Sequence, residues 1–172
     1  MTPVLTIVGA SGSGKTTLME RLIPELRSQA LVVAAIKHTH HDVDLEEPHK
    51  DSWRFREAGA ERVILVTRRW RFTVEPMPEP PDLGELVATA GLGVDLVLIE
   101  GFKRFELPAI EVWRSAVSER PQRAADDPRL LALVTEEEPP ADWRAVPRLP
   151  PEDTAGIANR IRAWRDAGRL RV

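Results

Sequence analysis

Short apolar runs alternate along the chain with longer segments of mixed polar and apolar residues. The runs lie at residues 4–8, 31–36, 62–67, 95–100, 109–113 and 130–134. Nearly continuous apolar character over so few residues is typical of strands buried on both faces. Helical patterns fall at residues 16–27, 52–57, 82–89 and 154–167. This alternation predicts an α/β fold with a mostly parallel sheet and helices on both faces.

Residues 71–75 have a different pattern, because polar and apolar positions alternate there. Such alternation indicates a strand near the edge of a sheet, with one face toward solvent. The next segment, residues 76–81, contains four prolines. Proline has no amide donor, so we expect a connecting loop there. Asp82 then follows as the expected N-cap of the next helix.

Composition narrows the class of protein. A chain of 172 residues, 42% of them hydrophobic, with a net charge of −3, suits one buried core, so we expect a single domain over residues 1–172. The absence of cysteine excludes disulfides and thiolate metal sites. No apolar run reaches the roughly 18 residues that span a bilayer, and no signal-peptide pattern is present, so we expect a cytoplasmic protein without a membrane partner. A pI of about 5.9 argues against a general affinity for nucleic acid.

The segment between the first apolar run and the first helix has the sequence GASGSGKT, residues 9–16. It fits the pattern G-x-x-x-x-G-K-[ST] after a strand and before a helix, which predicts a P-loop NTPase fold and a nucleotide-binding domain. The dinucleotide pattern G-x-G-x-x-G is excluded, because residue 17 is threonine. A tight glycine-rich turn without a ligand is the alternative.

A phosphate loop binds the α- and β-phosphates through backbone amides and the N-terminus of the following helix. Lys15 would reach the β- and γ-phosphates, and the Thr16 hydroxyl would ligate the Mg²⁺ ion that accompanies the nucleotide. The predicted nucleotide-binding residues of the loop are Gly9, Ala10, Ser11, Gly12, Ser13, Gly14, Lys15, Thr16 and Thr17.

A phosphate loop also needs an acidic partner that holds Mg²⁺. Asp95 and Glu100 flank the most strand-like run, and ligands bind at the carboxyl ends of parallel strands. We therefore predict that Glu100 holds the metal together with Thr16 and acts with Lys15 in catalysis, and that Asp95 lies at the far end. Gly101 would let the backbone approach a terminal phosphate. Ordinary solvated charges at a strand end are the alternative.

Lysine is scarce in this chain. Only four of the 24 cationic residues are lysine, and they are Lys15, Lys37, Lys50 and Lys103. Because arginine serves everywhere else, a lysine that persists can mark a place that needs a compact ammonium group. All four fall in segments expected at the carboxyl edge of the sheet, which favours anion binding there.

Three segments together resemble the MobB family, the GTP-binding adaptors of molybdopterin guanine dinucleotide biosynthesis. They are GASGSGKTTL, IKHTHHDVDLEEPHKDSWRFREAGA and DLVLIEGFK, and the resemblance extends over residues 4 to about 114. It implies a homodimeric P-loop protein that binds GTP and hydrolyses it weakly. Its partners would be molybdopterin and a molybdenum cofactor guanylyltransferase of the MobA type. Glu46 and His49 stand where the family often has aspartate and glycine.

Two other functions compete with this interpretation. Many small-molecule kinases begin with a similar phosphate loop, and Arg68, Arg69 or the arginines of residues 120–123 could belong to a lid. A GTP-dependent metal chaperone would use the histidines as a delivery site. The preference for GTP over ATP rests on the resemblance, since no N-K-x-D segment occurs. The acidic residues 135–138 lie where they could accept hydrogen bonds from guanine, or they form a solvated turn.

Every histidine lies within residues 37–51, namely His38, His40, His41 and His49. A metal site is one interpretation, completed by Asp42 and Asp44, although closely spaced histidines surround one ion poorly. A solvated loop is another. We prefer an anion or substrate site, whose predicted residues are Lys37, His38, His40, Lys50, Asp51, Ser52 and Lys103.

Overall fold

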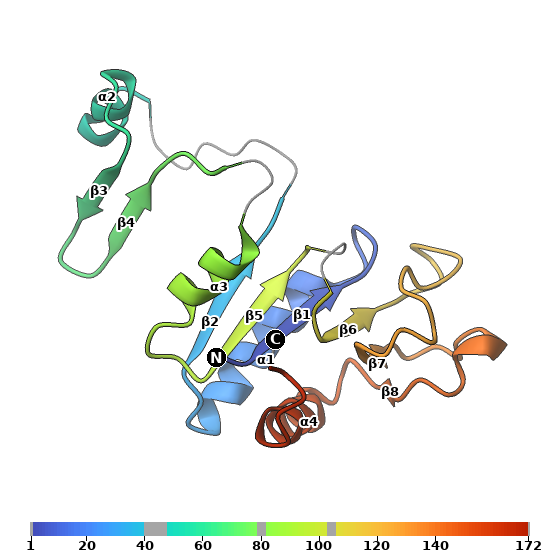
Figure 1. Cartoon of the computed structure of the whole chain (residues 1–172). Coiled ribbons are helices and arrows are strands. Elements are labelled where there is room, and N and C mark those ends of the chain that lie inside the picture. Colours follow the sequence, from blue (N-terminus) through green and yellow to red (C-terminus); the bar gives the residue numbers. More distant parts are fainter. Residues whose placement is uncertain (1, 40–47, 79–81, 103–105, 172) are drawn as a thin grey trace. The chain divides into compact units, whose positions relative to one another are not determined.

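The computed structural model describes residues 2–39, 48–78, 82–102 and 106–171. Figure 1 shows helices and strands alternating along the chain. The elements are β1 (Val4–Val8), α1 (Lys15–Ser28), β2 (Val33–Lys37), α2 (Asp51–Glu57), β3 (Val63–Val66), β4 (Arg71–Val74), α3 (Leu83–Ala90), β5 (Leu96–Glu100), β6 (Ala109–Val112), β7 (Leu130–Val134), the 3-10 turn η1 (Ala141–Trp143), β8 (Arg148–Leu149) and α4 (Thr154–Asp166). The predicted α/β class is confirmed.

Six strands form one sheet in the order β2-β5-β1-β6-β7-β8, and every neighbouring pair is parallel. Because the strands run in one direction, their carboxyl ends share one edge of the sheet. Glu100, the last residue of β5, lies in register with Lys37 of β2 on one side and Ile7 of β1 on the other. The register therefore brings the end of β2 to the predicted metal ligand.

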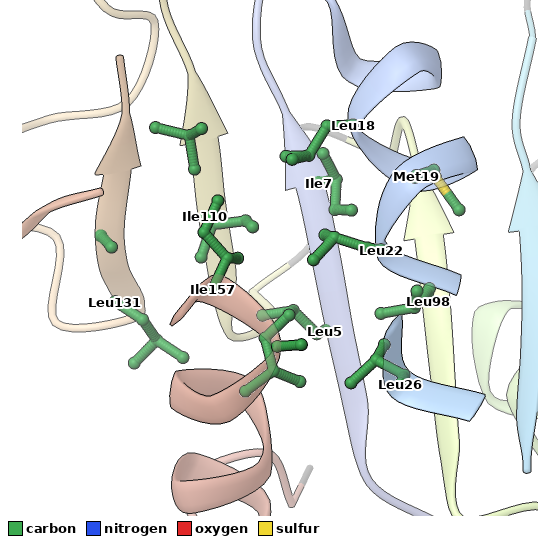
Figure 2. Packing of buried hydrophobic residues seen from close by; sticks show 14 of the residues in the cluster. Leu5, Ile7, Leu18, Met19, Leu22, Leu26, Leu98, Ile110, Leu131 and Ile157 are labelled. Carbon is green, nitrogen blue, oxygen red and sulfur yellow. The ribbon is translucent and has the colours of Figure 1, made fainter. Parts of the chain in front are cut away.

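The main core lies between the sheet and the helices α1 and α4. Leu18, Leu22 and Leu26 recur every fourth residue of α1, so they share one face of the helix. Figure 2 shows this face packed against Leu5 and Ile7 of β1. These residues are two positions apart in the strand, so their side chains point to the same side of the sheet. Burial of each such side chain stabilises the fold by about 1.5–3 kcal/mol.

The other face of the sheet carries α3. A right-handed crossover from β1 to β2 puts α1 on one face, and the return from β2 to β5 runs the opposite way across the sheet. The same handedness then places α3 on the second face, and Figure 1 shows it on the opposite side of β2 and β5 from α1. Helices on both faces were predicted, and this arrangement confirms them.

The chain divides into two compact units, residues 39–83 and the remainder. The smaller unit contains α2 and an antiparallel hairpin of β3 and β4, whose turn is closed by the Thr67 amide donating to the Trp70 carbonyl over 2.8 Å. Both strands were predicted, but their pairing with each other apart from the main sheet was not, because strand patterns do not specify partners and a short turn favours local pairing. The single-domain expectation stays a prediction, since a compact unit need not fold alone.

Two short elements, η1 and β8, have no counterpart among the predicted runs. β8 spans only Arg148–Leu149, too short for any periodicity, yet it pairs with β7 and extends the sheet. Among the described residues no helix is long and apolar enough to cross a membrane.

Candidate functional site

The glycine-rich loop, residues 9–14, connects β1 to α1 and packs against the end of β6. Gly9 has a φ of 140°, and a Cβ atom there would lie 2.3 Å from the Val112 carbonyl oxygen. Gly12 and Gly14 also have positive φ values of 78° and 103°. These conformations suit glycine, and they turn the chain tightly into the first turn of α1.

Lys15 begins α1 and folds back over this loop. Its Nζ donates a hydrogen bond to the Ala10 carbonyl over 2.7 Å. The Ser13 amide donates to the same carbonyl over 3.2 Å, so Ala10 is held from both sides. The ammonium group thus lies at the loop, where Lys15 was predicted to meet phosphate.

The Glu100 carboxylate joins three elements at the carboxyl edge of the sheet. The Thr16 hydroxyl of α1 lies 3.1 and 3.0 Å from its two oxygens, and Lys37 Nζ of β2 lies 2.8 Å from Oε1. Burial alone would raise the pKa of Glu100. The hydrogen bonds from Lys37 and Thr16 and the charges of Lys37 and Lys15 outweigh burial, so the pKa is lowered and Glu100 is ionised.

The turn after β5 brings His38 and Phe102 together. Gly101 has a φ of 105°, and a Cβ atom there would lie 3.0 Å from the His38 carbonyl oxygen. Phe102 is buried, and its ring centroid lies 4.2 Å from that of His38. The His38 amide donates to the Glu100 carbonyl over 2.9 Å, so the ends of β2 and β5 are joined at successive residues.

Thr16 and Glu100 together fit a magnesium ion. Mg²⁺ prefers oxygen ligands, and a hydroxyl and an ionised carboxylate already lie within hydrogen-bond distance of each other beside Lys15. Asp95, the rejected candidate, lies before β5 at the opposite end, where its Oδ2 accepts a hydrogen bond from the Val32 amide over 2.8 Å. The two acids therefore lie at the ends of β5 that the sequence predicted for them.

A cavity of about 230 Å³ opens beside the glycine-rich loop, between α1 and the carboxyl ends of β6 and β7. Its wall includes Ser13, Thr17, Arg21, Trp113, Glu136, Glu137 and Glu152. Sequence reasoning singled out the acidic segment after β7 but missed Arg21, Trp113 and Glu152. Glu152 follows β8, and without that strand nothing places residue 152 at this edge.

Three glutamates on the cavity wall differ in their partners. Both oxygens of Glu137 lie 3.1 Å from the Ser115 amide, and Glu152 lies 3.5 Å from Arg21. Glu136 shares a hydrogen bond with the Glu152 carboxyl, and this contact raises the pKa of Glu136 and lowers that of Glu152. Two acidic groups therefore lie close together at the cavity mouth.

The predicted anion site is brought together only in part. Lys37 and His38 lie at Glu100, whereas Lys50, Asp51 and Ser52 belong to the smaller unit. His40 and Lys103 lie outside the described residues, as do His41, Asp42 and Asp44.

The proposed metal and kinase sites also lack support in the described structure. His49 packs against Trp53 of α2, with ring centroids 5.0 Å apart, and the described histidines and acids form no cluster of three metal ligands. Two arginines of the supposed kinase lid are held by acids, since Arg120 pairs with Asp142 and Arg123 with Asp127.

Known proteins are similar to this chain over most of its length. The family described as molybdopterin guanine dinucleotide synthesis protein B matches residues 4–136. A molybdopterin-guanine dinucleotide biosynthesis adapter protein of Escherichia coli (strain K12) is 36% identical over 167 residues, 95% of this chain and 94% of that protein. A protein of the same description from Haemophilus influenzae is 44% identical over 135 residues, 77% and 74% of the two chains.

Solved structures have the same architecture. A crystal structure of molybdopterin-guanine biosynthesis protein B aligns with a TM-score of 0.74 at 28% identity, over 95% of this chain and 99% of that one. The structure of Bacillus subtilis MobB aligns with a TM-score of 0.72 at 21% identity, over 98% of each chain, and supports the fold alone.

Proposed function

The chain belongs to the MobB family of molybdopterin guanine dinucleotide synthesis proteins, and from this membership we propose that it is an adaptor in the biosynthesis of that cofactor. In this role it binds GTP with Mg²⁺ at the glycine-rich loop and hydrolyses it slowly. The observation that carries the proposal is the contact between the Thr16 hydroxyl and Glu100, beside Lys15. A hydroxyl, a carboxylate and an ammonium group at a helix N-terminus are the groups that hold a magnesium nucleotide.

Each group has a distinct part in binding. The amides of residues 9–14 and the N-terminus of α1 hold the phosphates, and Lys15 exchanges the Ala10 carbonyl for a phosphate oxygen. Thr16 and Glu100 hold the metal, which when bound offsets negative charge on the phosphates. The Gly101 backbone follows Glu100 at the same edge and belongs to the proposed phosphate site, while the space that its Cβ atom would take is filled by His38.

Slow hydrolysis follows from the environment of Glu100. Both of its oxygens accept hydrogen bonds, from Thr16 and Lys37, and its lowered pKa makes it a poor base. Such a carboxylate binds a cation better than it removes a proton from water. A slow GTPase suits an adaptor, whose bound state must persist while a partner is engaged.

The partners follow from the same pathway. We propose a homodimer that acts in the cytoplasm with molybdopterin and a molybdenum cofactor guanylyltransferase, the enzyme that attaches GMP to it. Lys37 and His38 lie at the end of β2, next to Glu100, where Lys37 supplies positive charge and the His38 imidazole can donate a hydrogen bond to a phosphate of GTP or of the pterin. The relatives named as adapter proteins support this assignment.

The direct test is a calorimetric titration of the purified protein with GTP and with ATP, each with and without Mg²⁺. We expect saturable GTP binding that is tighter with Mg²⁺ present. Absence of GTP binding under either condition contradicts the proposal. Transfer of a phosphate from ATP to a metabolite acceptor would support a small-molecule kinase instead.

A further inference from the structure

We propose that the cavity beside the glycine-rich loop holds the guanine base and that Glu136 recognises it, by accepting hydrogen bonds from the guanine N1–H and N2–H groups. This inference rests on the proposed binding of GTP and names the residue that makes the site specific for guanine.

The position of the cavity suits the base of a nucleotide whose phosphates lie in the loop. Its wall includes Ser13 of the loop, Thr17 and Arg21 of α1, and the segments that follow β6 and β7. Thr17 and Arg21 are four residues apart and therefore share a face of the helix. Continuing from the loop along this face, a nucleotide would pass from phosphate to ribose to base.

The cavity has a buried floor and one fixed apolar wall. Ser13 is only 2% exposed, and its Oγ lies beside Gly9 on the inner side of the loop, 2.8 Å from the position that a Cβ atom of Gly9 would take. Trp113 provides a fixed apolar wall, because it is buried and its Nε1 donates to the Ser118 carbonyl over 3.0 Å.

Of the three glutamates on the wall, Glu136 is the one suited to a ligand. Glu137 accepts from the Ser115 amide, and Glu152 is paired with Arg21. Glu136 contacts the Glu152 carboxyl instead, and the hydrogen bond between the two carboxyl groups raises the pKa of Glu136. A ligand with two adjacent donors would replace this contact with two hydrogen bonds to an ionised carboxylate.

A carboxylate distinguishes the two purines by chemistry alone. An ionised carboxylate only accepts hydrogen bonds. Guanine presents two adjacent donors, N1–H and N2–H, which match its two oxygens, whereas adenine presents N1 as an acceptor and would be repelled. A charge-assisted pair of this kind is strong and directional. The chain thus has a guanine-recognising group although it lacks an N-K-x-D segment.

The test compares Glu136→Gln with the matched control Glu138→Gln by calorimetry with GTP, ATP, inosine triphosphate and xanthosine triphosphate. Glu138 is close in sequence but outside the cavity, where it lies 3.1 Å from Arg148. We expect Glu136→Gln to weaken GTP binding roughly 10- to 100-fold, the effect of losing hydrogen bonds to a charged group. The amide can donate to the xanthine C2 carbonyl, so xanthosine triphosphate should bind this variant more tightly than it binds the wild type.

The wild-type protein supplies a second measurement. Inosine triphosphate lacks the 2-amino group, so it should bind roughly tenfold more weakly than GTP, and ATP should bind more weakly still. GTP binding that is identical in Glu136→Gln and the wild type overturns the guanine assignment and leaves the phosphate loop in place. Absence of binding of any nucleotide to the wild type overturns the proposed function as well. Since Glu136 is exposed, an unchanged melting temperature will show that the variant is folded.

Discussion

At the scale of single residues, lysine and glutamate define the site. Three of the four lysines have described positions, and two of them, Lys15 and Lys37, lie at the glycine-rich loop and at Glu100. Their compact ammonium groups donate to Ala10 O and Glu100 Oε1, respectively. A planar guanidinium would require a wider acceptor at either place. The scarcity of lysine in the sequence therefore carried information about these two positions.

Replacement of Lys15 tests the loop directly. Lys15→Ala removes the charge that backbone amides cannot supply, so we expect GTP affinity to fall roughly 10- to 100-fold with the fold retained. Arg27→Ala, which removes a cation from the last turn of the same helix, should leave the affinity unchanged. Calorimetry measures both variants. Equal GTP affinity in Lys15→Ala and the wild type would falsify the phosphate-loop assignment.

Replacement of Glu100 separates metal binding from nucleotide binding. Glu100→Gln retains the size of the side chain but removes the charge that holds Mg²⁺, so Mg²⁺-dependent GTP hydrolysis should fall much further than GTP affinity. Asp95→Asn changes the acid at the opposite end of β5 and should leave turnover nearly intact. Phosphate release measured under saturating GTP decides between them. A greater loss of GTP hydrolysis in Asp95→Asn than in Glu100→Gln would show that the metal ligand lies at the other end of β5.

At the scale of elements, the close packing of the glycine-rich loop on β6 fixes the loop. Gly9 and Gly93 both have positive φ, but only Gly9 has a backbone atom where a Cβ would be, since nothing lies within 4 Å of that position at Gly93. The pair therefore separates steric overlap from backbone strain.

We expect Gly93→Ala to lower the free energy of unfolding by about 1–2 kcal/mol, the cost of the left-handed backbone alone. Gly9→Ala should cost roughly 2–5 kcal/mol, because displacement of the Val112 carbonyl adds an overpacking penalty to that strain. Urea denaturation measures both values. Similar destabilisation by the two substitutions would mean that β6 can move away without cost.

The sequence predicted elements better than it predicted their partners. Apolar runs such as residues 130–134 coincide with a strand because burial on both faces requires continuous apolar residues. Periodicity contains no information about pairing, so it predicted the strands β3 and β4 but not that they form a separate hairpin. Glu100 was found because a carboxyl end faces ligands in any parallel sheet. Glu152 was missed because its position depends on β8, which is two residues long.

At the scale of the whole molecule, the smaller unit exposes unusually many large apolar side chains. Val66 is 71% exposed and Trp70 is 65% exposed, and Phe55, Ile64 and Phe72 are also exposed. A two-stranded hairpin is marginally stable alone, and a large exposed apolar patch marks an interaction site. Among the described strands, β3 and β4 pair only with each other, so each also offers an unpaired edge.

The proposed homodimer should therefore depend on this hairpin. Light scattering should give twice the mass of the chain at micromolar concentration, and Phe72→Glu should shift the protein toward monomer by placing a charge on β4. Arg68→Glu changes charge in the turn of the hairpin and should leave the dimer intact. A wild-type protein that is monomeric throughout the micromolar range would exclude the homodimer.

The position of β5 determines when the sheet can form during synthesis. β5 lies between β1 and β2, although both precede it in the chain by more than the whole smaller unit. When the ribosome has made β1, α1 and β2, the two strands cannot pair with each other as they do in the folded sheet, because β5 lies between them there. Their apolar faces therefore stay unburied until β5 has been made. Only after residue 100 emerges from the ribosome can β2, β5 and β1 pair side by side. The growing chain therefore carries unpaired strand edges over a long interval, and it is during that interval that a chaperone would protect it most.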